Sequence, residues 1–238
     1  MRNILSIAYK ELSIYFTSPM AYVVSGVFFA LTGVFFIDSV DQPFAPASVR
    51  GLLRNTAFFL MPLIPPIMTM RLFSEEQKLG TLELLQTAPV RDFEVVLGKF
   101  LSSLAILAAT VLLTLFYVLI LLFYSDPDLG PVLSGYLGML LYSAAALAIG
   151  LLASSLTGNQ IVAATVGFGI ILLFSVLGNV SSVVGGAAAT VLEHLSITNH
   201  FEGFARGVVD TSDVVYYIIV ASVFLFLTVR SVESRRWR

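Results

Sequence analysis

Nine of the chain's 28 charged side chains fall within one stretch, RLFSEEQKLGTLELLQTAPVRDFEVVLGKF, residues 71–100. They are Arg71, Glu75, Glu76, Lys78, Glu83, Arg91, Asp92, Glu94 and Lys99. Long runs without any charge lie on both sides of this stretch. Carboxylates and basic side chains at this density can form ion pairs with a binding partner. A solvated surface loop would have the same composition, so the stretch is either the working part of the protein or a plain loop.

Other kinds of chemistry have little support in the sequence. The two histidines, His194 and His200, form no HExxH pattern and are better explained as polar loop residues than as zinc ligands. The chain has no cysteine, no GxxxxGK[ST] phosphate loop and no serine paired with a base. Its net charge of −2 gives no reason to expect a nucleic-acid partner. We therefore expect no catalytic residue, no metal and no cofactor in this chain.

The elements that position the charged stretch are predicted to be membrane helices. The chain is 58% hydrophobic and 12% charged, with a mean hydropathy of +0.93, whereas soluble domains are about a quarter charged. About 20 apolar residues without charge can span a bilayer. The sequence predicts an all-α polytopic protein that forms a single transmembrane domain over 1–238. The predicted spans are 19–37, 55–70, 100–124, 133–156, 161–180 and 214–229.

Two of these spans carry proline signals. Ser18 is expected to cap the first span, with Pro19 at its first position, where the missing N–H costs nothing. The second span contains Pro62, Pro65 and Pro66, which predict a kink or break in the helix. Spans three, four and five contain no Asp, Glu, Lys, Arg or His. This argues against an ion-coupled or proton-coupled transporter, which usually places such groups at membrane depth.

Lysine and arginine are distributed unequally between the two sides of the predicted membrane. One side would carry ten of the 13 and the other side three: Arg50, Arg54 and Arg206. The positive-inside rule then places both termini and residues 71–99 in the cytoplasm. Residues 1–18 are predicted to form an amphipathic interfacial helix, with an apolar stripe at Leu5, Ala8, Leu12, Tyr15 and Phe16.

Two further features concern packing. The loop 181–213 on the outer side is too long for a plain turn and is expected to include short helices. Ala146, Gly150 and Ser154 repeat at every fourth position of span four and allow a second helix to approach closely. Packing within one subunit is the favoured explanation, and a subunit interface is the alternative.

Within 71–100, local signals predict a helical projection. Ser74 and Gln77 form a capping-box pattern that would start a short helix, and Gly80 can end it in the left-handed conformation. Thr81 would cap a second piece, LELLQT, closed by Pro89, and Asp92 would cap the helix that continues into span three. The leucines beside Glu83 suit docking into a groove of another protein.

The residue pattern R-x-F-x-E-E-x-x-x-G-T-L-E-L-L-x-T-x-P-V, followed by E-x-x-L-G-K-F, resembles the cytoplasmic signature of type 2 ABC-exporter permeases. Further segments resemble the gliding-motility-associated branch of these permeases. They are KELSIYFTSPMAY at 10–22, LLASSLTGNQIVA at 151–163, HFEGFARGVVDTSDVVYY at 200–217 and ESRRW at 233–237. The resemblance covers essentially the whole chain in order.

This resemblance implies a six-helix permease that works in the bacterial inner membrane with a separate ATP-binding-cassette ATPase, which carries the ATP and Mg. It also implies a dimer with a second copy or a related permease, and a further membrane protein with a large outside domain. The segment 71–99 would contain the coupling helix. The implied ATPase contacts are Glu75, Glu76, Gly80, Thr81, Glu83 and Leu84, and the residues that shape the return into span three are Pro89, Gly98 and Lys99. Neither motility nor the substrate follows from the resemblance.

Three alternatives stay open at this point. The ATPase strokes could act mechanically on an outside partner and move no substrate. The chain could instead be an ATP-independent membrane scaffold or lipid-handling protein, because no polar pathway is visible in the spans. An intramembrane enzyme would need a polar cluster that the spans do not show.

Overall fold

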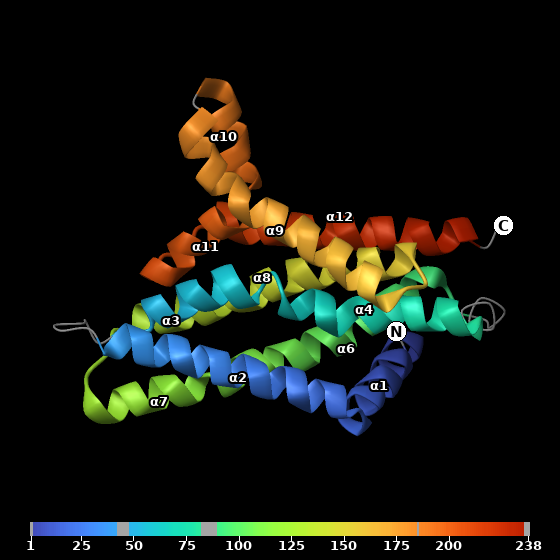
Figure 1. The fold of residues 1–238 in the computed structure, drawn as a ribbon, viewed down its shortest axis with the longest axis horizontal. Helices are drawn as coiled ribbons and strands as arrows, with labels where there is room; N and C mark the ends of the chain where they lie inside the picture. Colours follow the sequence, from blue (N-terminus) through green and yellow to red (C-terminus); the bar gives the residue numbers. More distant parts are fainter. Residues whose placement is uncertain (1, 42–47, 82–89, 185, 236–238) are drawn as a thin grey trace.

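The computed structural model describes residues 2–41, 48–81, 90–184 and 186–235 (Figure 1). In these residues the regular elements are all helices, and six helical segments are long and apolar enough to cross a membrane. The prediction of an all-α polytopic protein with six spans is confirmed. The segments are Pro19–Val40, Arg50–Leu79, Asp92–Tyr124, Leu129–Leu156, Gln160–Ser181 and Thr211–Ser234.

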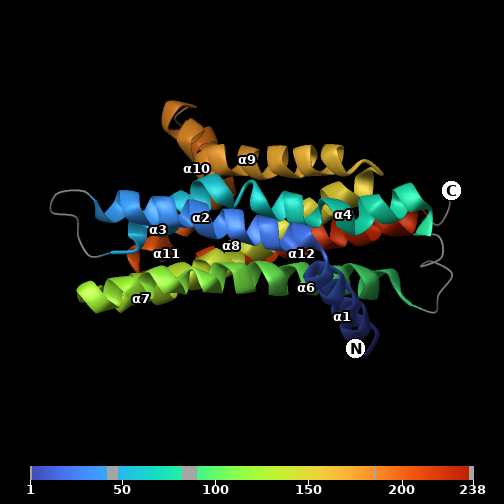
Figure 2. The same cartoon turned by 60° about the horizontal axis from the view of Figure 1, so that its bottom comes forward.

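The helices follow one another along the chain with short connections. They are α1 (Arg2–Thr17), α2 (Pro19–Val40), α3 (Arg50–Asn55), the π-helix η1 (Thr56–Leu60), α4 (Ile64–Leu79), α6 (Asp92–Leu113), α7 (Leu115–Tyr124), α8 (Leu129–Leu156), α9 (Gln160–Val184), α10 (Gly186–Leu195), α11 (Ile197–Arg206) and α12 (Thr211–Arg235). In the elongated bundle, α4 ends and α6 begins at the end where α12 also ends (Figures 1 and 2). We call this the α4–α6 end, and the opposite one the α2–α3 end.

Helix α8 is the centre of the bundle. In the most apolar 18-residue stretch of α8, 72% is buried inside the bundle, compared with 11% in the corresponding stretches of α2 and α12. Helix α8 packs against α4, α6, α9, α11 and α12. Its small residues make this possible: a Cβ at Gly150 would overlap the Thr69 hydroxyl on α4 and come within 3.4 Å of the Pro66 Cα. The small-residue face therefore packs within the subunit, as favoured from the sequence.

The second span is divided into two parts. Helix α3 runs into the π-helix η1, a turn covers 61–63, and α4 then begins with prolines in its first turn. Pro65 and Pro66 lack the N–H groups that would bond to the carbonyls four residues earlier, so the helical hydrogen bonds cannot continue through this point. Pro62 lies in the turn itself. The span also extends well beyond the expected 55–70, because α4 continues to Leu79.

The expected capping box at Ser74 is wrong. Ser74 lies inside α4, and its hydroxyl bonds to the carbonyl of Met70 one turn earlier instead of capping a new helix. Gly80 does end the helix in the left-handed conformation, with φ 69°, as expected. Ser18 caps α2 ahead of Pro19, also as expected. The second predicted piece, LELLQT, and Pro89 lie outside the described residues.

The third span begins earlier than expected. Helix α6 starts at Asp92, with Arg91 and not Asp92 as the capping residue, and the Arg91 N–H donates to Glu94 Oε2 over 3.1 Å. Lys99 is therefore two turns inside a helix. The region 181–213, expected as a loop with short helices, consists of the end of α9 followed by α10 and α11 (Figure 1). Helix α10 projects sideways from the bundle (Figures 1 and 2).

Candidate functional site

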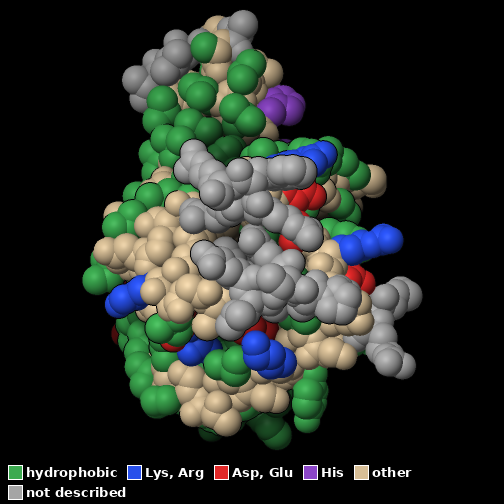
Figure 3. Space-filling model, turned by 90° about the vertical axis from the view of Figure 1, so that its right-hand side faces the viewer, with side chains coloured by type: hydrophobic (Ala, Val, Ile, Leu, Met, Phe, Trp, Pro, Cys, Tyr) green, Lys and Arg blue, Asp and Glu red, His purple; other side chains and the backbone are tan. Residues whose placement is uncertain are grey.

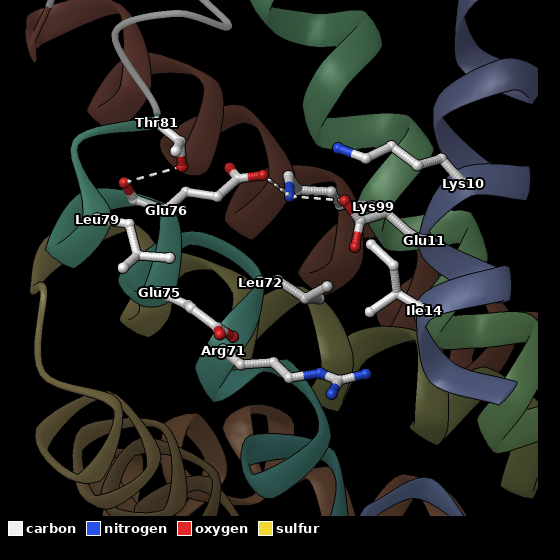
Figure 4. A pocket seen from close by; sticks show the side chains of 10 residues that line it. All are labelled: Lys10, Glu11, Ile14, Arg71, Leu72, Glu75, Glu76, Leu79, Thr81 and Lys99. Carbon is white, nitrogen blue, oxygen red and sulfur yellow. Dashed lines mark hydrogen bonds and ion pairs between the residues drawn. The ribbon is translucent and has the colours of Figure 1, made fainter. Parts of the chain in front are cut away.

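A buried lysine joins three helices at the α4–α6 end. The Lys99 side chain, on α6, is 2% exposed. Its Nζ lies 3.0 Å from Glu11 Oε1 on α1 and 2.8 Å from Glu76 Oε1 on α4 (Figure 4). The Phe73 ring centroid is 5.3 Å from the same ammonium group. We call Glu11, Glu76 and Lys99 the ion cluster. Burying charges is unfavourable unless they are paired, so the two carboxylates are what permits a lysine here.

The neighbour of Lys99 explains how α1 comes close enough. A Cβ at Gly98 would lie 2.7 Å from Ile7 Cγ2 and 3.1 Å from the Ile4 carbonyl oxygen, both on α1. Only glycine therefore allows α1 to lie on α6 at this distance. The next turn of α1 then brings Glu11 to Lys99. Gly98 and Lys99, predicted to shape the return into span three, act at the contact between α6 and α1.

Further contacts hold α1 against α4. The Tyr15 hydroxyl donates to the Met68 carbonyl over 2.6 Å, and the Arg71 guanidinium lies 4.3 Å from the Tyr15 ring centroid. Burial raises the pKa of the Tyr15 phenol well above its usual range, so the phenol stays a neutral donor. Arg71 Nη1 also donates to Ser18 Oγ over 3.1 Å. Helix α1 is thus attached to both α4 and α6.

The apolar stripe expected on α1 divides between two environments. Ala8 and Tyr15 are buried in the bundle, and Leu5 and Phe16 are exposed on its outside, where an interfacial helix would meet lipid. Glu11, which the stripe left out, is buried beside Ala8 and Tyr15. Glu11 follows Ala8 by three residues and precedes Tyr15 by four, so it lies on the same helix face as these two residues. An acidic side chain on such a face needs a partner, and this spacing could have identified Glu11 as a site residue.

Helix α4 is held equally closely to α8. Ser154 Oγ accepts hydrogen bonds from the backbone N–H groups of Phe73 and Ser74, both over 3.1 Å, and donates to the Met70 carbonyl over 2.8 Å. Gln77 Nε2 donates to the Ser155 carbonyl over 2.8 Å. A displacement of the end of α4 therefore acts on the central helix as well as on the ion cluster.

A cavity of about 460 Å³ opens between α1 and α4, and the three side chains of the ion cluster form part of its lining (Figure 4). Its lining consists of Lys10, Glu11, Ile14, Arg71, Leu72, Glu75, Glu76, Leu79, Thr81 and Lys99. Two buried polar atoms of this lining, Glu76 Oε2 and Arg71 Nη2, have no hydrogen-bond partner in the described part of the chain. The lining of the cavity therefore has hydrogen-bonding capacity that the described part of the chain does not use.

Three of the six predicted contact residues, Glu75, Glu76 and Thr81, line this cavity. Glu75 is exposed and lines it, Glu76 belongs to the ion cluster, and the Thr81 hydroxyl donates to the Glu76 carbonyl over 3.4 Å. Gly80 is the residue between them that ends α4. Glu83, Leu84 and Pro89 lie outside the described residues. Pro62, Pro65 and Pro66 lie at the break of the second span, away from the cavity lining. Sequence reasoning missed Glu11, Arg71 and Ser154.

The face at this end is charged and the flanks are apolar. Figure 3 shows lysine and arginine side chains spread over the end, with hydrophobic side chains along the sides. The histidines lie elsewhere: His200 Nδ1 is 2.6 Å from Asp213 Oδ1, between α11 and α12. Among the residues that the structure describes, no group of three His, Asp or Glu side chains could hold a metal ion.

The family model described as "ABC-2 family transporter protein" matches residues 4–231, which is nearly the whole chain. No curated protein matches the chain.

Proposed function

The chain belongs to the ABC-2 transporter family and is a membrane-spanning permease subunit of an ABC transporter; from this premise we propose that a separate ATPase drives it from the α4–α6 end. The chain has no phosphate-binding loop of its own, so the energy for transport has to come from a partner chain. The ATPase would carry the ATP and Mg. The work done is export of a substrate or mechanical action across the membrane.

The ion cluster is the observation that carries this proposal. The chain between Thr81 and Val90 connects the helix of Glu76 to the helix of Lys99. A partner that pushes on this connection moves both helices, and Glu11 transfers the movement to α1. Packed, hydrogen-bonded helices respond as rigid elements, because protein interiors are close-packed. The cluster is therefore suited to transmit one displacement to three elements.

We assign contact and transmission to different residues. Glu75, Glu76, Gly80, Thr81, Glu83 and Leu84 contact the ATPase, and Pro89, Gly98 and Lys99 transmit the movement into α6. Glu75, Glu76 and Thr81 support this division, because they line a cavity between α1 and α4 that is open to the outside. Both termini and the α4–α6 end lie in the cytoplasm, in agreement with the excess of lysine and arginine there.

Family membership supports a permease dimer, and the resemblance to the gliding-motility-associated branch supports the remaining partners. The permease works as a dimer with a second copy or a related permease, surrounded by lipids of a bacterial cytoplasmic membrane. A membrane protein with a large outside domain, as in the gliding-motility-associated branch, would be a further partner. The segment 200–217 that resembles this branch forms most of α11 and the start of α12.

Co-expression with a candidate ABC ATPase from the same genome tests the proposal. The pair Leu84→Asp and Glu76→Lys is expected to abolish co-purification, because it removes an apolar anchor and reverses a contact charge, and Leu84→Asp alone, which leaves the ion cluster intact, is the second variant. Lys99→Met, assayed well below its lowered unfolding temperature, is expected to leave the ATPase bound but to lower ATP-dependent activity at least about tenfold, since it removes the ion cluster and no partner contact. Lys78→Met, which changes an exposed lysine at the end of the same α4, is the matched control.

Two results would contradict the proposal. Co-purification that survives the Leu84 and Glu76 changes would place the ATPase elsewhere. Full activity in cells that lack the ATPase would favour the ATP-independent scaffold or lipid-handling protein. Transport of a defined substrate into vesicles would exclude the purely mechanical version.

A further inference from the structure

A second charged pocket lies at the opposite end of the bundle, the α2–α3 end. It has a volume of about 450 Å³ and is lined by Arg54, Asn55, Phe58, Phe59, Asn179, Thr198, Asn199, Glu202 and Arg206. Figure 1 shows α3 and α11, which supply most of these residues, at the end away from the C-terminus. The ion cluster takes no part in this pocket.

The pocket is formed by the polar face of α11. Ile197, Phe201, Phe204 and Ala205 form the buried face of this helix. Thr198, Glu202 and Arg206 follow one another at intervals of four residues and so lie along one other face. This face is turned toward α3 and η1, which supply Arg54, Phe58 and Phe59. The amphipathic pattern of α11 therefore presents a polar row to the pocket.

Two guanidinium groups converge on one carboxylate there. Arg54 Nε lies 2.7 Å from Glu202 Oε1, and Arg206 Nη2 lies 3.7 Å from Glu202 Oε2. The two arginine side chains are 67% and 71% exposed, so most of their donors remain open to a ligand. One carboxylate offsets only one of the two positive charges. The pocket thus keeps a net positive charge with donors arranged for an anion.

Neither fold stability nor a generally basic surface accounts for this pair. Exposed ion pairs contribute only about 0–1 kcal/mol to stability. The connections at this end carry eight acidic residues and only three basic ones, and two of these three are Arg54 and Arg206. The acidic residues are Asp38, Asp41, Asp126, Asp128, Glu193, Glu202, Asp210 and Asp213. The concentration of positive charge is thus local to the pocket.

The surroundings of the pocket are apolar on the membrane side. Phe59 is 57% exposed, and Val176 and Val180 are exposed on either side of Asn179 along α9. The segment η1 that carries both phenylalanines is a π-helix, a form often found at functional sites. An acyl chain can lie along these side chains while its polar head enters the pocket.

We propose that this pocket binds the headgroup of an anionic phospholipid from the leaflet at the α2–α3 end. The phosphodiester accepts hydrogen bonds from Arg54 and Arg206, and the side chains of Asn55 and Thr198 border the hydroxylated part of the head. The Thr198 hydroxyl is buried and has no hydrogen-bond partner among the described residues. The proposal is independent of the ATPase and of the ion cluster.

Short-chain lipids added to the purified full chain in detergent test this inference. Dihexanoyl phosphatidylglycerol is expected to bind saturably and at least about tenfold more tightly than dihexanoyl phosphatidylcholine. Glycerol 3-phosphate, a phosphomonoester of glycerol without acyl chains, separates a lipid from a free anion. It is expected to bind at least about tenfold more weakly than the phosphatidylglycerol.

Arginine variants link the binding to the pocket. Arg54→Gln with Arg206→Gln is expected to weaken phosphatidylglycerol binding at least about tenfold. Arg206→Gln alone is the second variant, since its contact to Glu202 is long and its loss leaves α11 in place. Arg50→Gln, on the same α3 but outside the pocket lining, is the matched control and is expected to bind as the unchanged chain does.

Three outcomes would overturn the proposal. Equal binding of phosphatidylcholine would show that no anion is recognised. Equal binding of glycerol 3-phosphate would assign the pocket to a soluble phosphate compound. Unchanged phosphatidylglycerol binding in Arg206→Gln and in the double variant would place the lipid outside this pocket.

Discussion

At the scale of single residues, the charge balance at Lys99 decides how variants will behave. One ammonium group faces two carboxylates, and all three side chains are at least largely buried. Removing the lysine leaves two carboxylates close together with no positive charge between them. Removing one carboxylate leaves a neutral pair. Both changes delete one charge, but the first leaves two unpaired negative charges and the second leaves a balanced ion pair.

We expect Lys99→Met to destabilise the purified protein by roughly 3–5 kcal/mol, the usual cost of breaking a buried ion cluster. Glu11→Gln is expected to cost only about 1 kcal/mol, because Glu76 still neutralises Lys99 and the amide can still accept a hydrogen bond. Thermal unfolding in detergent measures both. A larger loss in Glu11→Gln than in Lys99→Met would show that the lysine does not depend on this pairing.

At the scale of elements, the approach of α1 to α6 depends on one missing side chain. Gly98→Ala is expected to destabilise the protein by about 1–3 kcal/mol, because its Cβ would meet Ile7 and the α1 backbone at once. Gly169→Ala is the matched control: it lies inside α9, and an added Cβ there meets nothing within 4 Å. Its effect is expected to be neutral or slightly stabilising.

The same pair of variants also tests the role of α1. If Gly98→Ala lowers ATP-dependent activity while Gly169→Ala does not, the contact between α1 and α6 takes part in coupling. If both variants keep full stability and activity, α1 does not depend on this close contact, and the assignment of Glu11 to the ion cluster loses its basis.

Elements with strong local signals were predictable from the sequence. The apolar runs gave the six spans, Ser18 and Pro19 gave the start of α2, and Gly80 gave the end of α4. The capping pattern at Ser74 predicted a helix start that the structure does not have, because Ser74 lies inside α4. The backbone N–H of Ser74 donates to Ser154 Oγ, 80 residues away in the sequence. Local pattern alone contains no information about such a contact.

The candidate site was predictable only in part for the same reason. The charged stretch drew attention to Glu76 and Lys99, but their third partner, Glu11, is 88 residues away from Lys99 in the sequence. The position of Glu11 on an apolar helix face indicated that it needs a buried partner. The sequence did not indicate that this partner is Lys99. The pocket at Arg54 and Arg206 combines residues from three separate segments, and no short motif connects them.

At the scale of the whole molecule, α8 connects the two ends of the bundle. Near one end, Ser154 bonds to the backbone of α4. Near the other end, Ser134 Oγ donates to the Phe204 carbonyl on α11 over 2.7 Å. A rigid, central helix attached at both ends allows a displacement of α4 to reach α11 and the pocket beside it.

The proposed orientation can be measured directly, since the chain contains no cysteine that would interfere with labelling. We expect a membrane-impermeant maleimide to label Asp126→Cys in intact cells, because this exposed residue lies at the α2–α3 end. Ser234→Cys, exposed near the end of α12, is expected to react only after the membrane is opened. The reverse pattern would invert the topology and move the proposed ATPase contacts outside the cell.

The order of the ion cluster along the chain has a consequence for biogenesis. Glu11 and Glu76 both precede Lys99, so a chain synthesised from its N-terminus already contains both carboxylates when the lysine emerges from the ribosome. In the proposed orientation Lys99 lies at the cytoplasmic end of the third span, so its two partners are already present when α6 is made. The order of these three residues along the chain means that no member of the ion cluster has to wait for a helix made later.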